Sequence, residues 1–138
     1  DDPRCKRFLE KIKMLEMPVL LEEEFEETKR FFKGNPGIDI IIPHMGKLNG
    51  GYERMQAFYD RENVYFDTST ASIEAIKKCL EAVGPSRIIF GSDVSGTTEP
   101  FYNFPKVELE KIRKLDLKKD CLELILSGNI ERLASRKF

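Results

Sequence analysis

Histidine, tryptophan and paired cysteines are scarce in this sequence, and each shortage narrows the kinds of site it can hold. The 138 residues include one histidine, His44, and no tryptophan. The three cysteines, Cys5, Cys79 and Cys121, stand far apart, so neither a disulfide framework nor a Cys-x-x-Cys metal site is expected. We interpret them as free thiols in a reducing compartment. Because no export signal opens the sequence, we expect a cytoplasmic protein.

The sequence also lacks a strong net charge and long apolar runs. Lys and Arg number 23 against 24 Asp and Glu, a formal net charge of -1, which gives no reason to expect a nucleic acid or an anionic membrane as partner. Apolar stretches such as 38–43 end after a few residues, whereas a bilayer span requires about 20. The 41% of hydrophobic residues is enough to bury a core. We therefore expect a soluble globular domain.

Four short apolar segments, rich in β-branched and bulky residues, predict strands at 17–21, 38–42, 64–66 and 87–90. None alternates polar and apolar residues, which predicts a parallel sheet that is buried on both faces. Apolar residues at helical spacing predict amphipathic helices at 5–15, 25–32, 52–59, 73–83, 107–115, 122–125 and 130–135. The alternation of strand and helix predicts an α/β fold of parallel (β/α) units.

The spacing of the strands is somewhat under that of an eight-unit TIM barrel, in which about 250 residues make eight units, and the length of the chain fits half of such a barrel. We expect residues 1–138 to form a single, partial TIM-barrel domain. The sequence begins Asp1-Asp2-Pro3 without an initiator methionine, so we expect that an upstream part has been removed. Four units leave the sheet open, which predicts that an N-terminal half or a second copy closes it.

Polar residues follow the predicted strands, and in parallel βα folds such positions meet at one end of the sheet. Glu22 follows the first strand, His44 the second and Asp93 the fourth. His44 is either a functional imidazole at a strand tip or a satisfied core or surface histidine. Asp93 is either a functional carboxylate or a cap of a helix or turn.

An imidazole and a carboxylate together suit a divalent cation such as zinc, and an aspartate can also accept a proton from water. Catalytic zinc usually has three protein ligands, so further ligands must come from elsewhere. Glu22 is one candidate, although residues 22–24 can equally be acidic residues at a helix N-terminus. We interpret Asp67-Thr68-Ser69 as the cap of the helix at 73–83 rather than as catalytic residues, and Asn129 as the cap of the last helix.

Several motifs occur in order along the chain: Pro-His-Met-Gly at 43–46, Asp-Thr-Ser at 67–69, Phe-Gly-Ser-Asp at 90–93 and Asn-x-x-Arg-Leu at 129–133. With the strands before them, they resemble the amidohydrolase-related group of the amidohydrolase superfamily, which includes aminocarboxymuconate semialdehyde decarboxylase. The resemblance implies strands five to eight, the C-terminal half, of a metal-dependent TIM barrel. A His-x-His pair is then expected in the half before Asp1.

The resemblance also implies roles for the polar residues. His44 corresponds to a strand-six histidine that binds metal or polarises the substrate, and Asp93 to a strand-eight aspartate that contacts metal and handles the proton of the attacking water. Glu22 departs from the family, which usually has a histidine there. The cofactor implied is a divalent metal, zinc or manganese, and the partner a small-molecule substrate.

Three functions follow as hypotheses. The first is a metal-dependent hydrolase or decarboxylase that acts on a small carbonyl, amide or ester compound through metal-activated water. The second is a catalytically degenerate barrel relative without metal, which serves as a structural or binding module. The third is an independent open-sheet binding domain, which exposed sheet edges disfavour.

Overall fold

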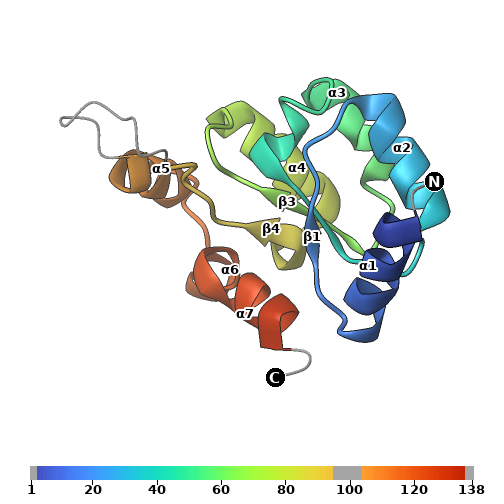
Figure 1. The fold of residues 1–138 in the computed structure, drawn as a ribbon. Helices are drawn as coiled ribbons and strands as arrows, with labels where there is room; N and C mark the ends of the chain where they lie inside the picture. The colour runs from blue at the N-terminus through green and yellow to red at the C-terminus, as the bar shows by residue number, and fades with distance from the viewer. Residues whose placement is uncertain (1–2, 95–103, 136–138) are drawn as a thin grey trace.

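A computed structural model describes residues 3–94 and 104–135, and its centre is a four-stranded parallel sheet (Figure 1). The strands are β1 (Val19–Leu20), β2 (Ile40–Ile42), β3 (Val64–Asp67) and β4 (Ile88–Ile89), and they lie in chain order. Every neighbouring pair is parallel. The four predicted strands and the α/β class are confirmed. Strands β1, β2 and β4 are shorter than predicted, whereas β3 extends one residue further, to Asp67. At β4 the shortening arises because Arg87 belongs to a 3-10 turn, Pro85–Arg87.

Helices connect and flank the strands. They are α1 (Pro3–Met14), α2 (Phe25–Gly34), α3 (Tyr52–Met55), α4 (Ile73–Val83), α5 (Phe104–Arg113), α6 (Lys119–Glu123) and α7 (Asn129–Ala134). Short 3-10 turns are η1 (Pro43–Gly46), η2 (Gln56–Phe58) and η3 (Pro85–Arg87), and η4 (Leu124–Gly128) is π-helical. The predicted helix 52–59 is thus divided between α3 and η2. Across 3–94 and 104–135, no helix has the length and apolarity needed to cross a membrane.

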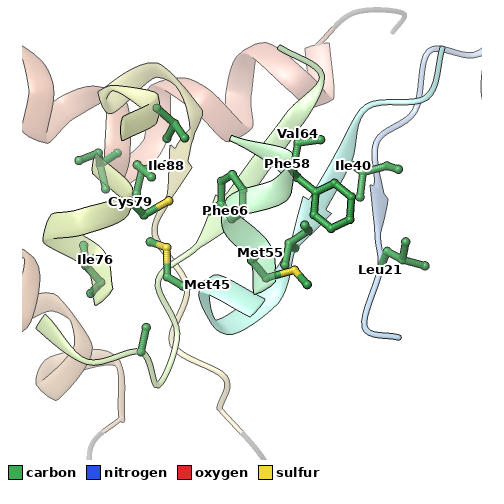
Figure 2. Close-up of a cluster of buried hydrophobic side chains, with 14 of the residues drawn as sticks. Leu21, Ile40, Met45, Met55, Phe58, Val64, Phe66, Ile76, Cys79 and Ile88 are labelled. Atoms are coloured by element: carbon green, nitrogen blue, oxygen red, sulfur yellow. The ribbon is translucent and has the colours of Figure 1, made fainter. Parts of the chain in front are cut away.

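The larger core lies on the face of the sheet that α1, α2 and α4 cover. The strands present alternate residues to it, and Figure 2 shows how side chains from β2, β3 and β4 meet those from the turns and helices. Fully buried members of this cluster are Phe32, Ile40, Ile42, Met55, Val64, Phe66, Ile76 and Ile88. Burying one such large apolar side chain contributes roughly 1.5–3 kcal/mol. This packing fixes the strands on which the polar side chains stand.

The three cysteines are free, as predicted, and their environments differ. Cys5 is exposed, Cys121 is half-buried and Cys79 is buried. Burial raises the pKa of the Cys79 thiol to about 12, and it also raises the pKa of Tyr59, which hydrogen-bonds with Cys79. Cys79 therefore stays protonated at neutral pH and serves as a small apolar residue of the core.

The opposite face of the sheet carries a second, smaller cluster. Ile41, Tyr65 and Ile89 are packed there with Leu133 of α7. The register places Leu20 beside Ile41 and Ile41 beside Tyr65, so Leu20 belongs to the same row. Figure 1 shows α6 and α7 next to β4, at the far side of the sheet from α1 and α2. Helix α7 therefore covers only the β4 end of this face.

Asn129 does not cap the last helix, contrary to the sequence prediction. It is fully buried, and its Nδ2 donates hydrogen bonds of 2.7 Å to the carbonyl oxygens of Pro85 and Ile88. Helix α7 continues from η4 through a helical Gly128, so its first turn needs no side-chain cap. The Asn129 side chain instead ties α7 to the start of β4.

Candidate active site at the strand ends

The backbone that carries His44 is held in an uncommon conformation. His44 and Met45 have φ angles of 55° and 52°, in the left-handed region that costs a residue with a side chain roughly 1–2 kcal/mol. Met45 is anchored in the core with 2% of its surface exposed. The next residue must be Gly46, since a Cβ there would lie 1.8 Å from Cγ of Met55. Packing thus holds a strained turn directly after β2, and such strain is concentrated at functional sites.

The imidazole of His44 is buried between two strand ends. Its Nδ1 lies 2.9 Å from Oγ and 3.1 Å from the carbonyl oxygen of Ser69, which follows β3. Its Nε2 lies 3.2 Å from Oε2 of Glu22, which follows β1. The His44 side chain is 7% exposed and the Glu22 side chain 45%, so the pair opens to solvent on the Glu22 side. The structure therefore brings together two of the three predicted site residues.

Asp67, Thr68 and Ser69 do not form a helix cap, and this part of the sequence interpretation is wrong. The cap of α4 is Ser72, whose Oγ accepts from the amide of Ala75 at 3.1 Å. Oδ1 of Asp67 accepts from the amides of His44 at 3.3 Å and Ser69 at 2.9 Å, and from Oγ of Ser69. The carboxylate joins the ends of β2 and β3.

Gly91 makes room for this carboxylate on the β4 side. A Cβ at Gly91 would lie 1.7 Å from Oδ2 of Asp67, a distance at which two atoms cannot coexist. The amide of Gly91 also donates to Oγ1 of Thr68 at 3.2 Å, and the amide of Thr68 donates to the carbonyl oxygen of Ile89 at 2.9 Å. Asp67 consequently sits where the ends of three strands converge.

The end of β1 is tied to the same region by Asn49. This residue is fully buried, and its Nδ2 donates to the carbonyl oxygen of Leu21 at 3.0 Å. Leu21 immediately precedes Glu22, so the bond fixes the backbone from which the glutamate projects. The sequence offered no signal for Asn49, because its partner lies 28 positions away. For Asp67 and Ser69 a signal is present, as polar residues at the end of a buried strand, but the same residue types also predict a helix cap.

Asp93 lies four residues beyond the end of β4 and is exposed, with a φ angle of 49°. The structure does not gather it with Glu22 and His44 into a ligand cluster. In the part of the chain that the structure describes, no three His, Cys, Asp or Glu side chains are placed to hold a metal ion.

The pair of Glu22 and His44 nevertheless has the chemistry of part of a metal site. An imidazole nitrogen and a carboxylate oxygen are both zinc ligands, and these two atoms lie 3.2 Å apart at a solvent-facing edge. The other ring nitrogen is held by Ser69, as the second ring nitrogen of a metal-binding histidine usually is. Two donors are fewer than the three of a catalytic zinc site. The pair therefore fits a divalent cation only together with donors from outside it.

Comparison with known proteins agrees with this architecture. The amidohydrolase family model matches residues 1–134. No curated protein matches the sequence. Among solved structures, amidohydrolase 2 from Bifidobacterium longum subsp. infantis is similar, with a TM-score of 0.71 and 16% identity over 97% of this chain and 56% of that one.

Two further structures extend the comparison. The 5-carboxyvanillate decarboxylase from Sphingomonas paucimobilis gives a TM-score of 0.65 and 17% identity over 96% of this chain and 53% of its own. An uncharacterized TIM-barrel protein from Bordetella bronchiseptica gives a TM-score of 0.70 and 21% identity over 98% of this chain and 51% of its own. These likenesses show the fold. The chain spans just over half the length of each of these proteins, as half of a barrel would.

Proposed function

Because this chain belongs to the amidohydrolase family, we propose that the protein is a metal-dependent hydrolase or decarboxylase acting on a small carbonyl, amide or ester compound. Residues 1–138 would form one partial domain, strands five to eight of its barrel. The observation that carries the proposal is the contact of 3.2 Å between Nε2 of His44 and Oε2 of Glu22 at the carboxyl ends of parallel strands. In such folds this end of the strands is where active sites lie.

Each of the polar residues has a place in this proposal. Glu22 and His44 would hold a divalent cation, zinc or manganese, with Asp93 and with donors outside these 138 residues. When bound, such a cation polarises a carbonyl group and acidifies water. The exposed carboxylate of Asp93 accepts the proton of the attacking water. We also propose a cytoplasmic location, because the three cysteines are free thiols.

Substitution of His44 and Asp93 in the full-length protein tests the proposal. We expect His44→Gln and Asp93→Asn each to lower kcat/KM at least about 100-fold, the usual contribution of a general acid or base. The assay is turnover of a panel of small carboxylated, amide and ester compounds. Asp60→Asn, an exposed carboxylate at the other end of β3, is the control and should keep full activity. If both site variants turn over the best compound at the wild-type rate, the proposal is wrong.

The degenerate relative remains the second candidate, and Glu22 is the observation that favours it. The family resemblance leads one to expect a histidine at this position, and the described residues supply only a pair of donors. Full-length protein expressed with zinc or manganese distinguishes the two, by elemental analysis of the purified sample. Stoichiometric metal that is lost in His44→Gln supports the enzyme, whereas metal-free protein without turnover supports a structural or binding module.

A further inference from the structure

Asp67 has no role in the function proposed above, yet its carboxylate is buried at the centre of the strand ends. The residue is 9% exposed, and its Oδ1 accepts from two amides and from Oγ of Ser69. These partners are all neutral. Removing a carboxylate from water is costly unless it is well hydrogen-bonded, so its bonds indicate what the group is there to hold. All of them lead to His44 or to Ser69.

The direction of these hydrogen bonds determines which nitrogen of His44 carries a proton. An ionised carboxylate only accepts, so the bond between Asp67 and Ser69 uses the single hydrogen of the Ser69 hydroxyl. Toward His44, that hydroxyl oxygen can then only accept, at 2.9 Å from Nδ1. The carbonyl oxygen of Ser69, at 3.1 Å from Nδ1, is also only an acceptor. Oγ1 of Thr70, 3.2 Å from Nδ1, can donate or accept and so does not oppose a proton there. With both Ser69 oxygens as acceptors, Nδ1 is the N–H donor.

The opposite nitrogen is left for the site. A neutral imidazole has one N–H group, so a proton on Nδ1 leaves a lone pair on Nε2. This lone pair faces Oε2 of Glu22 at 3.2 Å, on the side that opens to solvent. Two electron-rich atoms so close require a cation or a proton between them. An Nε2 that is free of its own hydrogen can take either.

We infer that Asp67, acting through Ser69, is a positioning residue that selects the Nδ1–H tautomer of His44 and aims Nε2 at Glu22. The inference rests on the proposed function for its purpose, because a ligand or base at this place needs the lone pair on Nε2. What it predicts is the position of the proton on the His44 ring, which can be measured without substrate or turnover. The chain from Asp67 through Ser69 to His44 joins the ends of β2 and β3, so both strands set the orientation of the ring.

Nitrogen NMR of the imidazole tests the inference. His44 is the only histidine of these 138 residues, and in the full-length protein its signal is identified by its loss in His44→Gln. Two-bond proton–nitrogen correlations in ¹⁵N-histidine-labelled protein, at a pH where the ring is neutral, distinguish the tautomers. We expect the wild-type protein to show Nδ1 protonated and Nε2 bare. A neutral ring protonated on Nε2 would overturn the inference without any variant.

Variants then test whether Asp67 and Ser69 cause this state. We expect Ser69→Ala and Asp67→Ala each to speed exchange of the Nδ1 proton at least roughly fivefold, the equivalent of about one net hydrogen bond. Both should also raise the fraction of the Nε2–H tautomer. Ser69→Thr keeps the hydroxyl and should therefore show the same tautomer and the same proton exchange rate as the wild-type protein. A Ser69→Ala spectrum identical to the wild type would overturn the inference.

Ser72→Ala is the matched control. It removes the cap of α4, three positions after Ser69, and destabilises the protein by about 1 kcal/mol. The hydroxyl that it removes bonds to the amide of Ala75. Its spectrum should be unchanged. If Ser72→Ala altered the imidazole signals as much as Ser69→Ala does, the effect of Ser69→Ala would be explained by general destabilisation, and the inference would be overturned. The wrong tautomer with normal turnover would leave the proposed function standing. The expected tautomer in a protein without turnover would refute only that function.

Discussion

At the scale of single residues, the site depends on which atoms donate and which accept. Asp67 and Ser69 hold His44 through bonds whose directions follow from the chemistry of carboxylate, hydroxyl and carbonyl groups. Gly91 contributes because it has no side chain, which leaves the volume that the Asp67 carboxylate occupies. A residue without a side chain is therefore as necessary to this arrangement as the residues with functional groups.

Substitution of Gly91 should disturb the site through Asp67. In Gly91→Ala the new methyl group would overlap Oδ2 of Asp67, so the carboxylate must move and its bonds to His44 and Ser69 must weaken. We expect the free energy of unfolding to fall by roughly 1–3 kcal/mol, the usual cost of overpacking. Urea unfolding monitored by circular dichroism measures this.

The control for this substitution is Gly37→Ala. A Cβ at Gly37 meets no atom within 4 Å. This substitution should be neutral, or stabilising by about 0.4–1 kcal/mol through the unfolded chain. Equal unfolding curves for the two variants would show that Gly91 does not make room for Asp67.

At the scale of the elements, the strand ends are held from both sides by side chains that bond to backbone carbonyls. Asn49 fixes the end of β1 at Leu21, and Asn129 fixes α7 to β4 at Ile88. The amide of Phe90 also donates to the carbonyl oxygen of Ile125, in the π-helical turn η4, at 2.9 Å. The outer edge of β4 is thus satisfied by the C-terminal helices.

Loss of the Asn129 amide should detach α7 from β4. In Asn129→Ala the carbonyl groups of Pro85 and Ile88 lose a donor in a buried place, which costs roughly 1–3 kcal/mol of unfolding free energy. Asn129→Asp has the same shape but presents acceptors to acceptors, so it should cost at least as much. Thermal and urea unfolding measure both.

Glu131→Ala is the matched variant for this helix, because Glu131 is exposed on α7. It should change the unfolding free energy by less than about 0.5 kcal/mol. An Asn129→Asp protein as stable as the wild type would contradict the role of Asn129 as a donor.

At the scale of the whole molecule, the two edges and the two faces of the sheet differ in how far helices cover them. Helices cover one face, and α7 covers the β4 end of the other. The β1 end of the second face is bare: Leu20 continues the row of Ile41 and Tyr65 but is 61% exposed. Phe8, Met14 and Met17 are also exposed on α1 and the turn before β1. A large apolar side chain exposed at the uncovered end of a sheet face, as Leu20 is, is typical of a surface that another part of a protein covers.

The isolated 138-residue segment should therefore self-associate through the β1 side. We expect wild-type segment to sediment as more than a monomer, and Leu20→Asp to shift it toward the monomer, because a carboxylate on this row opposes burial. Analytical ultracentrifugation measures both. Leu48→Asp places the same charge at another exposed leucine, 53% accessible, and should leave the association unchanged. A wild-type segment that is monomeric throughout would contradict the prediction.

The sequence by itself determined the order and type of the elements, because short apolar runs and helical periodicity are local signals. All four strands and the alternation with helices follow from them. It also determined which polar residues stand at strand ends, and the pairing of Glu22 with His44 agrees with that expectation. At Asp67-Thr68-Ser69 and at Asn129 the sequence predicts helix caps, and both predictions are wrong because Asp67 and Asn129 bond to residues far away in the chain.

Only the tertiary structure decided what those residues bond to. Asp67 bonds to His44, Asn49 to Leu21 and Asn129 to Ile88, at separations of 23, 28 and 41 positions in the chain, and no local pattern encodes a contact of that range. The same holds for the space at Gly91, which is defined by a neighbouring strand. Hydrogen bonding is directional and packing excludes volume, so both take effect only once the strands lie side by side.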